Sequence, residues 1–370
     1  MSNAKKSRGI VAVNGVQVKF TSISVEQNAF SAADSFEIVL PYFIRDQQSG
    51  ETILANGPDF TSVLLTQDVI PVSAWVGYPA NPLNYTVNDL AQVMDGYMDT
   101  ARWDFDKTGE IVTLNGRNMV GPLIDAKIVD KFPNLTSSAI AIKFALEHGL
   151  TPVVTPTSTL AGTYYNQNST ITGNNSMSEW DLLLFLAQQE NFIVRVKGRQ
   201  LLFGPYGTVT GYVDQTPIPL TWGQNIETLE FERSPQAAKD IVVKVISYDR
   251  NYKHRIEETA KSTTQYAQRI LNQAGQRQQY VETYTIPGLT RDQAQKKAIA
   301  ICNELSRSQI IGEVTCAGDP NMSIDRKIQI QGVGQILSDY YYLNKVTHQF
   351  DMDNGYGTDA SFSNQFLTDS

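Results

Sequence analysis

The chain has 370 residues, of which 41% are apolar and 18% charged, a composition that excludes wholesale disorder and leaves room for two or three domains, each with its own core. The formal net charge of -8 excludes a general nucleic-acid binder, because the molecule as a whole repels phosphate backbones. Two cysteines without a CxxC pair exclude a disulfide framework and a thiolate metal clip.

Residues 10–125 alternate between apolar and polar with a period of two, which predicts strands. Asn56-Gly57-Pro58 predicts a turn among them. Residues 103–116 read as two strands joined at Lys107-Thr108-Gly109. We therefore expect residues 1–125 to form a first, tube-like β-barrel domain.

Helical spacing appears next, in TSSAIAIKFALEHG, where Thr136 can cap the start and Gly149 can take the left-handed position after the end. A second helix is expected to begin near Ser178, which forms a capping pair with Asp181. The stretch FIVRVKGRQLLF after it predicts a hairpin, whereas residues 155–177 are polar and predict a loop. Residues 126–217 are thus expected to form a mixed α+β middle domain.

The period of two returns in residues 218–370, which we expect to form a second β-barrel domain. DIVVKVISYD is apolar on both faces and predicts a central strand. The polar stretch at about 251–279 has no apolar stripe and predicts an arm. A helix at about 290–306 is predicted by the Thr290 and Gln293 capping pair. Further strands are predicted at 310–316, 328–330 and 340–352.

The sequence has no segment that predicts membrane insertion. The N-terminal MSNAKKSRGIV is basic but has no apolar stretch behind it, and the longest apolar run, residues 182–187, is far too short to span a bilayer. With the cysteine pattern, this leads us to expect a soluble product of the cytosol.

The usual catalytic motifs are absent, among them GxSxG, HExxH and the phosphate loop ending in GK[ST]. His148 is expected at a helix end, as a surface charge favoured by the helix dipole, and His254 in the polar arm. Cys302 and Cys316 fall on apolar faces and are expected to be buried, inert thiols. The excess of basic residues between 239 and 297 favours a solvated surface, with contact to an acidic partner as the alternative.

Two aspartate pairs are the remaining candidates for chemistry. Asp104 with Asp106, and Asp351 with Asp353, each place both carboxylates on one side of a strand. Glycoside hydrolysis needs only two suitably spaced carboxylates, so the sequence leaves this alternative open. We favour solvated carboxylates near turns, since the spacing also lacks the later acidic ligands of a calcium loop.

The stretch HQFDMDNGYG raises the question of a site formed by His348, Asp351 and Asp353. Alternation places the histidine on the opposite face from both aspartates, so the strand cannot bring them together. Asn354-Gly355 supplies the positive φ angles of a tight turn, and we predict a hairpin with no catalytic, cofactor or metal site. The face expected to point to the core holds Tyr340, Tyr342, Asn344, Val346, His348, Phe350 and Met352.

Four stretches resemble the phage baseplate hub family, also called late control D or tail-hub proteins, which is related to the hub part of type VI secretion spike proteins. They occur in the family's order through all three regions. They are LNGRNMVGPLID, SMSEWDLLLFLAQQENFIVRVKGRQLLF, TIPGLTRDQAQKKAIAICNEL and IQIQGVGQILSDYYYLNKVTHQFDMDNGYGTDASF.

The resemblance implies a mainly β fold with two tube-like β-barrels flanking the mixed domain, and a structural, non-enzymatic role in the virion, in the tail baseplate. It implies a homotrimeric ring, assembled in the host cytoplasm, that joins the tail tube or distal tail protein to a spike and lines the DNA channel without binding DNA specifically. Other baseplate proteins and the tape measure protein are the remaining expected partners. Because no β-helix repeats occur in these residues, the central spike is expected to be a separate polypeptide. The alternatives are a tail-associated cell-wall glycoside hydrolase and a carbohydrate-binding β module.

Overall fold

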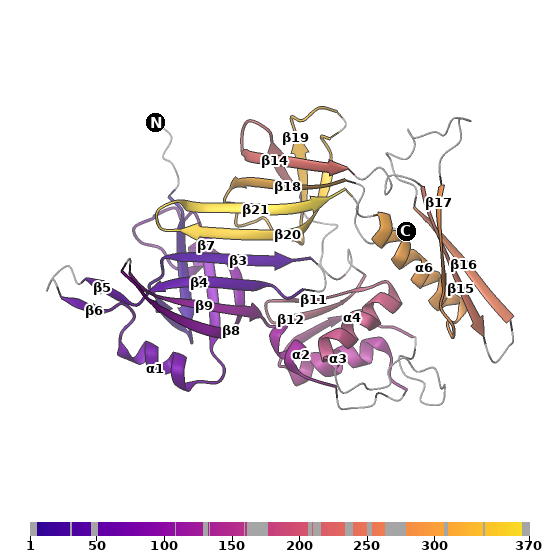
Figure 1. Ribbon diagram of the computed structural model, residues 1–370, viewed down its shortest axis with the longest axis horizontal. Coiled ribbons are helices and arrows are strands. Elements are labelled where there is room, and N and C mark those ends of the chain that lie inside the picture. Colours follow the sequence, from indigo (N-terminus) through magenta and orange to yellow (C-terminus); the bar gives the residue numbers. More distant parts are fainter. Residues whose placement is uncertain are drawn as a thin grey trace.

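A computed structural model of the chain shows a mainly β protein, as expected. Most of its strands belong to one extended sheet (Figure 1). The structure describes residues 6–29, 32–45, 51–107, 109–128, 132, 134–158, 160, 177–205, 209, 216–233, 240–249, 254–262, 279–306, 310–335 and 337–364.

The large sheet contains 13 strands and includes both predicted β regions. Strand β3 from the start of the chain pairs antiparallel with β20 from its end, so the two regions form one continuous sheet rather than two separate ones. Off the main path, β13 (Ile218–Thr221) pairs with β19 (Lys327–Gln331), which pairs with β20. The path runs through β14 (Ile226–Arg233), β18 (Ile310–Ala317), β21 (Gly355–Ser363), β20 (Tyr340–Asp351), β3 (Ser22–Asn28), β4 (Ser35–Pro41), β9 (Glu110–Asn118), β8 (Ala91–Phe105), β7 (Pro71–Gly77), β1 (Arg8–Val13) and β2 (Val16–Val18).

The N-terminal half of the sheet encloses the first hydrophobic core, which contains residues such as Val11, Ile38 and Leu114. The predicted hairpin of residues 103–116 is confirmed by the antiparallel pairing of β8 with β9. The expectation of strands throughout is wrong at α1 (Pro58–Thr66), where Pro occupies the first helical position and Leu64 reaches the core. Short elements also include β5 (Phe43–Arg45), β6 (Thr52–Leu54) and the 3₁₀ turn η1 (Val87–Asp89).

The C-terminal half encloses its own core, which includes Tyr341, Leu343 and Phe362. The predicted core face of β20 is wrong for the first part of this strand. A β-bulge between Leu343 and Lys345 inserts one residue and reverses the alternation, so Tyr341 is buried and Tyr340 is exposed. After the bulge, Val346, His348 and Phe350 point to the core, as predicted. The prediction is wrong again for Met352, which follows the end of the strand and is exposed.

The middle of the chain forms a mixed unit of helices and a three-stranded sheet with a core of its own. The predicted caps are confirmed, because the Thr136 hydroxyl accepts from Ala139 N, and Ser178 and Asp181 form a reciprocal capping box. Gly149 follows the first of these helices with a φ of +67°. The elements are α2 (Gly121–Asp125), α3 (Ser137–Glu147), β10 (Thr151–Val154), α4 (Glu179–Glu190), β11 (Ile193–Lys197) and β12 (Gln200–Gly204).

Residues 240–306 include a separate small sheet covered by one helix, with a fourth core between them. Strand β15 (Asp240–Asp249) lies between β16 (His254–Ser262) and β17 (Gln279–Thr285), which confirms its central position. Helix α6 (Arg291–Ser306) begins at the predicted Thr290 and Gln293 cap. The predicted polar arm is wrong for β16, because this segment pairs with β15 as a strand. The pairing buries only Ile256 and Ala260, so the sequence shows no apolar stripe there. Residues 251–253 and 263–278 of the predicted arm lie outside the described residues.

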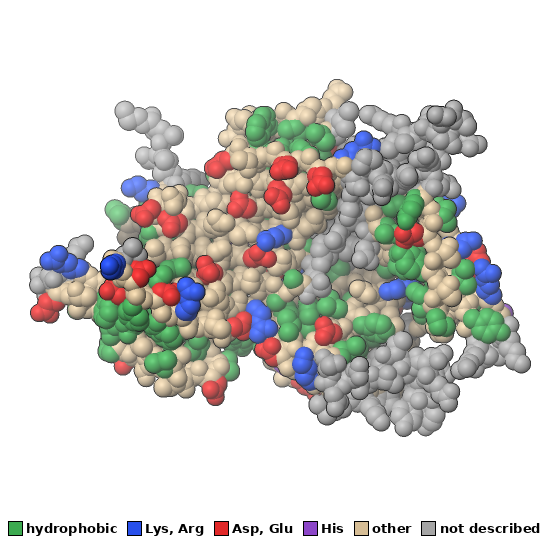
Figure 2. Space-filling model, viewed as in Figure 1, with side chains coloured by type: hydrophobic (Ala, Val, Ile, Leu, Met, Phe, Trp, Pro, Cys, Tyr) green, Lys and Arg blue, Asp and Glu red, His purple; other side chains and the backbone are tan. Residues whose placement is uncertain are grey.

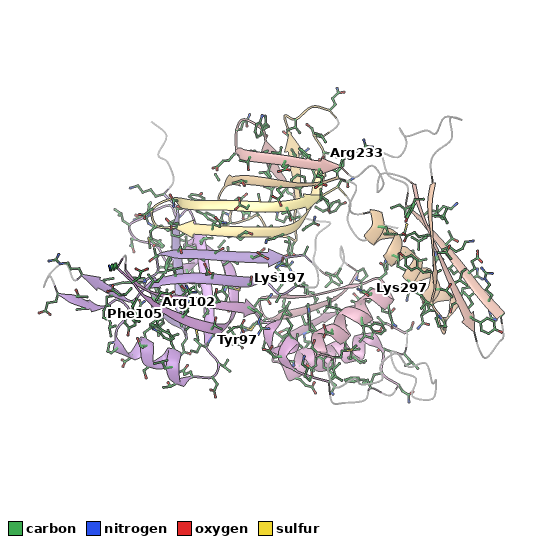
Figure 3. All side chains as sticks on the ribbon, in the orientation of Figure 1. Tyr97, Arg102, Phe105, Lys197, Arg233 and Lys297 are labelled. Carbon is green, nitrogen blue, oxygen red and sulfur yellow. The ribbon has the colours of Figure 1, made fainter. Side chains whose placement is uncertain are left out.

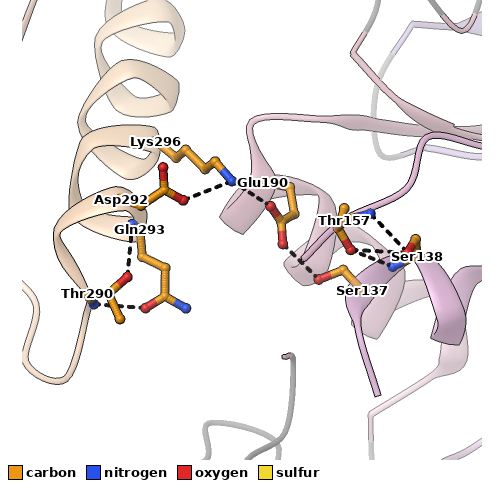
Figure 4. A network of polar contacts seen from close by, with 8 residues as sticks. All are labelled: Ser137, Ser138, Thr157, Glu190, Thr290, Asp292, Gln293 and Lys296. Atoms are coloured by element: carbon orange, nitrogen blue, oxygen red, sulfur yellow. Dashed lines mark hydrogen bonds and ion pairs between the residues drawn. The ribbon is translucent and has the colours of Figure 1, made fainter. Parts of the chain in front are cut away.

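Ion pairs with buried carboxylates join these units. Asp325, next to β19, is buried and accepts from Arg195 and from Lys197 Nζ at 2.7 Å, both on β11. Glu190 at the end of α4 meets Lys296 of α6 at 3.0 Å (Figure 4). A charge buried in this way stabilises a fixed arrangement, because removing one partner leaves the other desolvated.

The hairpins β8–β9 and β20–β21 have the same local design, although they lie in different halves of the sheet. A Phe-Asp pair stands at the end of the first strand of each hairpin, at Phe105-Asp106, where β8 ends at the phenylalanine, and at Phe350-Asp351, where β20 ends at the aspartate. In both, the aspartate accepts a hydrogen bond at 3.0 Å from the amide three residues later. In both, a register shift ends five residues before the phenylalanine. Strand β8 therefore corresponds to β20, and β9 to β21.

The other strands of the two halves correspond as well. Gly116 of β9 lies opposite Phe36 of β4, and Gly312 of β18 lies opposite Phe362 of β21. A Cβ on either glycine would lie 2.4 Å from Cζ of the phenylalanine ring, so each glycine makes room for the ring. The order of the strands in the sheet makes β4 the counterpart of β18, and its neighbour β3 the counterpart of β14. The glycine–phenylalanine pair stands at the same place in both halves, with the two residues exchanged between the corresponding strands. The sheet contains two copies of one four-stranded arrangement.

Candidate interaction surface

Eight strands of the large sheet, from β14 to β8, present one polar face. In Figure 1 they lie one below another, from β14 at the top to β8 at the bottom. Their side chains alternate, so the opposite face carries both apolar cores. This polar face, which we call the open face, extends across both halves of the sheet.

Carboxylates outnumber cations on the open face. In Figure 2 the region is mainly tan, with acidic side chains scattered over it and few basic ones. Lys345 is paired with Glu26 at 2.5 Å. Glu230, Glu232 and Glu313 are exposed and have no ion pair with a described residue. Carboxylates of this face include Glu26, Glu37, Asp104, Glu230, Glu232, Glu313, Asp351 and Asp359, and its cations include Arg102, Arg117 and Lys345.

One edge of the eight strands is the second half of β8. The first half of β8 pairs with β7, and the last hydrogen bond on that side runs from Met98 N to Ile70 O (3.0 Å). After Met98, β9 is the one described strand that pairs with β8. Residues 99–105 therefore have one unpaired backbone side within the described part of the chain. Arg102 and Phe105 are exposed on this segment (Figure 3).

The other edge is β14, seven residues of which pair with β18, whereas Glu227 stands at a register shift. Ile226 also forms an isolated bridge with Trp222. No described strand pairs with its other side. All of its residues except Ile226 are exposed or half-buried, including Arg233 at its end (Figure 3). A long bare strand edge is a template for pairing with another chain.

His348 lies in the core and is kept neutral by its surroundings. The ring is 1% exposed, and Nδ1 lies 2.7 Å from the hydroxyl of Tyr356. Burial lowers the pKa of His348 to about 4. The histidine is separated from Asp351 and Asp353, as the alternation of the strand predicted.

The two aspartate pairs have structural contacts. Asp351 Oδ1 accepts from the amides of Asp353 (2.8 Å) and Asn354 (3.0 Å), so this carboxylate stabilises the hairpin turn. Asp106 Oδ1 accepts from Gly109 N in the same way, and Asp104 pairs with Arg102 at 2.7 Å.

The hairpin at the end of β20 is confirmed, but the predicted turn geometry is wrong in part. Of the two turn residues, Gly355 alone has a positive φ, of +86°. The turn contains three residues between Asp351 and Gly355, which form a cross-strand pair. The left-handed position that such a loop needs lies directly after its three residues, at Gly355, the first residue of β21.

The remaining candidates also have structural surroundings. His148 is half-buried instead of a free surface charge, with Nε2 2.6 Å from Glu179 Oε2, which joins the end of α3 to the start of α4. Cys302 and Cys316 are buried, and burial raises the pKa of the Cys316 thiol to about 12, which leaves it unreactive. His254 begins β16. Among described residues, no group of three or more His, Cys, Asp or Glu could hold a metal ion.

The fold of the whole chain matches that of phage tail proteins. A tail protein from Neisseria meningitidis MC58 aligns with a TM-score of 0.65 at 14% identity, over 97% of this chain and 96% of that one. The 43 kDa tail protein of prophage MuSo2 from Shewanella oneidensis aligns with a TM-score of 0.66 at 14% identity, over 96% and 98%. An E. coli type VI secretion component, described as similar to T4 bacteriophage tail proteins, aligns at 0.54 and 13% identity, over 95% and 76%. The resemblance to the baseplate hub family is thereby confirmed in the fold.

A family model covers more than half of the chain. The model described as the Alg8 N-terminal domain matches residues 108–351, and the chain belongs to this family. No curated protein matches the sequence. Within the described part of the chain, no helix has the length and apolarity needed to cross a membrane.

Proposed function

We propose that the protein is a structural baseplate hub of a phage tail or a related contractile injection machine. Three copies form a ring that joins the tail tube to a separate central spike protein. Residues 1–125 and 218–370 are the two tube-like domains, 126–217 the middle domain, and the small unit within 240–306 an insertion in the last. The protein is part of the virion, in the tail baseplate, and takes no part in catalysis.

The observation that carries this proposal is the continuous sheet with an open polar face and two bare edges. The other strands and helices of the chain lie on the covered side of the eight-stranded sheet and beyond the ends of its strands (Figure 1). A ring of such sheets has the longer circumference on its covered side, so the open face points inward. This arrangement also gives the bare edges partners, as a closed sheet requires.

The charge of the open face suits a channel for DNA. Glu230, Glu232 and Glu313 are free of described cations and would repel phosphates. DNA therefore passes through the ring without being held. The other partners in this proposal are the tail tube or distal tail protein, the tape measure protein and further baseplate proteins.

The proposal is tested with the purified full-length protein by size-exclusion chromatography with light scattering, beside a peptidoglycan zymogram. We expect three times the mass of one chain and no cleared zone. A monomer that digests cell walls would support the glycoside hydrolase instead.

A further inference from the structure

The small sheet within residues 240–306 lies at one end of the molecule and has two edge strands, β16 and β17 (Figure 1). Strand β15 lies between them, antiparallel to β16 and parallel to β17. No described strand pairs with the outer side of either edge strand. A bare strand edge is a template for pairing with another chain unless its side chains oppose such pairing.

The odd-numbered residues of β17 point their backbone groups away from β15. Ile286 N donates to Ile246 O at 2.9 Å, so the even-numbered residues of this strand bond to β15. The next odd-numbered residue after the strand, Pro287, has no amide, and the free edge ends before it. The residues with outward amides and carbonyls include Val281, Thr283 and Thr285.

The outer edge of β16 carries charges, whereas that of β17 does not. The odd-numbered residues of β15 bond to β16 and lie opposite its even-numbered residues, so the odd-numbered residues of β16 point outward. They include Arg255, Glu257 and Lys261. Charged side chains, lysine above all, keep an edge strand from pairing, whereas valine and threonine favour strands. Strand β17 is therefore the edge that is open to pairing.

Glu282 gives the edge of β17 a negative charge. One carboxylate oxygen accepts from the hydroxyl of Tyr280 at 2.7 Å, and the other accepts from the hydroxyl of Tyr284. The hydrogen bonds from Tyr284 and Tyr280 lower the pKa of Glu282, so the group is charged at neutral pH. No described cation pairs with it.

The two faces of the sheet offer different neighbours to an added strand. Glu282 lies opposite Val243, a residue of the core beneath α6, so the carboxylate is on the face that α6 covers. Val281, which is 56% exposed, and Thr283 are on the other face. A segment that has a lysine or arginine between β-branched residues complements both faces, because the cation would lie beside the carboxylate and its tyrosine rings.

A second copy of this chain is a poor partner for the same edge. The antiparallel register that brings together all the outward residues of two β17 strands pairs Thr283 with Thr283. It places the two Glu282 side chains diagonally on one face, and a shift of two residues places them directly opposite each other. Like charges repel in both registers, whereas a basic segment of another protein removes the repulsion.

We propose that the edge of β17 binds an extended segment of another polypeptide as an additional strand, and that this segment carries a lysine or arginine beside Glu282. Main-chain hydrogen bonds to the outward residues of β17 would supply the affinity, and the carboxylate would supply the preference for a cation. The site lies outside the eight-stranded sheet, so the inference goes beyond the proposed ring and does not rest on it.

Peptide binding to the full-length protein tests the site, measured by fluorescence anisotropy. The probe is a short labelled peptide of alternating threonine and valine with a lysine in place of the central valine, and the matched peptide has a glutamate there. We expect the lysine peptide to bind about fivefold more tightly than the glutamate peptide. In Glu282→Gln this difference should disappear.

Two substitutions at one position test the role of the backbone. Thr283→Pro removes an outward amide but no hydrogen bond to β15, and it should abolish binding. Thr283→Val keeps the amide and should bind as the wild type does. Hydrogen exchange of the wild-type protein tests the same point without a substitution, because the amides of Val281, Thr283 and Thr285 should become protected only when the lysine peptide is present.

Several results would overturn the inference. They are no binding at about 1 mM lysine peptide, equal affinity of the wild type for both peptides, and binding that Thr283→Pro leaves intact. Protection of the outward amides before peptide is added would show that the chain itself covers the edge. A mass in light scattering that Thr283→Pro halves would show that the partner is a second copy.

Discussion

Lys296 of α6 and Glu190 of α4 form an ion pair of 3.0 Å between two parts of the chain that are far apart in the sequence. The carboxylate is 2% exposed and also accepts from Ser137 at 3.2 Å (Figure 4). Burial lowers the pKa of Lys296, but its hydrogen bonds to Glu190 and Asp292 outweigh this and raise it. The small unit within 240–306 is therefore held to the middle unit by a buried charge.

Lys296→Met should destabilise the protein by about 3 kcal/mol, because it leaves the Glu190 carboxylate buried without this cation. The measurement is urea unfolding followed by fluorescence. Asp292→Asn is the matched control, since Asp292 is 70% exposed and its contact with Lys296 contributes about 0.5 kcal/mol at most. Equal losses in the two variants would contradict a buried pair.

Acid should unfold the protein partly through His348. Its pKa is about 4 in the folded protein and 6.5 for a free histidine, so between these values the unfolded chain binds the additional proton. Stability from this group is complete above about pH 6.5 and falls by up to about 3 kcal/mol as the pH drops to 4. In His348→Phe, the free energy of unfolding should fall less steeply over this window. An unchanged slope would mean that the histidine is already protonated in the fold.

Asp351 and Asp353 should differ in what they contribute. Asp351→Ala removes the acceptor of two turn amides and should lower the free energy of unfolding by about 1 kcal/mol. The Asp353 side chain has no described hydrogen-bond partner, so Asp353→Ala should lower it by less than about 0.5 kcal/mol. Thermal unfolding of both variants provides the measurement. The hydrolase alternative instead predicts that both substitutions abolish a cell-wall activity while stability stays the same.

Proline at the bare edge of β8 should separate the copies without unfolding them. The Ala101 amide points away from β9, so Ala101→Pro removes no bond of the internal ladder and blocks the bond to a neighbour. We expect a folded monomer by light scattering and circular dichroism. Ala101→Val keeps the amide and should remain trimeric. A trimer that tolerates the proline would show that this edge of β8 takes no part in the contact between copies.

Local signals in the sequence predicted the local structure well. The caps at Thr136, Ser178 and Thr290 depend on side chains within three residues of one another, and all three are confirmed. The burial of His348 followed from alternation along one strand. These features need no knowledge of distant segments.

Features that depend on distant partners were not predictable in this way. The bulge before Lys345 moves Tyr341 into the core, and no residue type marks it. The pairing of β3 with β20 joins residues more than three hundred positions apart. The open face had a sequence signal, in the alternate acidic residues Glu230 and Glu232, but which face is covered depends on the whole sheet.

In the proposed function, copies of this chain close into a ring around a channel lined by the open face. Electron microscopy of the purified full-length protein tests it most directly. We expect class averages of a hollow ring with threefold symmetry and strand density continuous between neighbouring copies. Single particles of one chain, or an assembly with the open face on its outer surface, would contradict it.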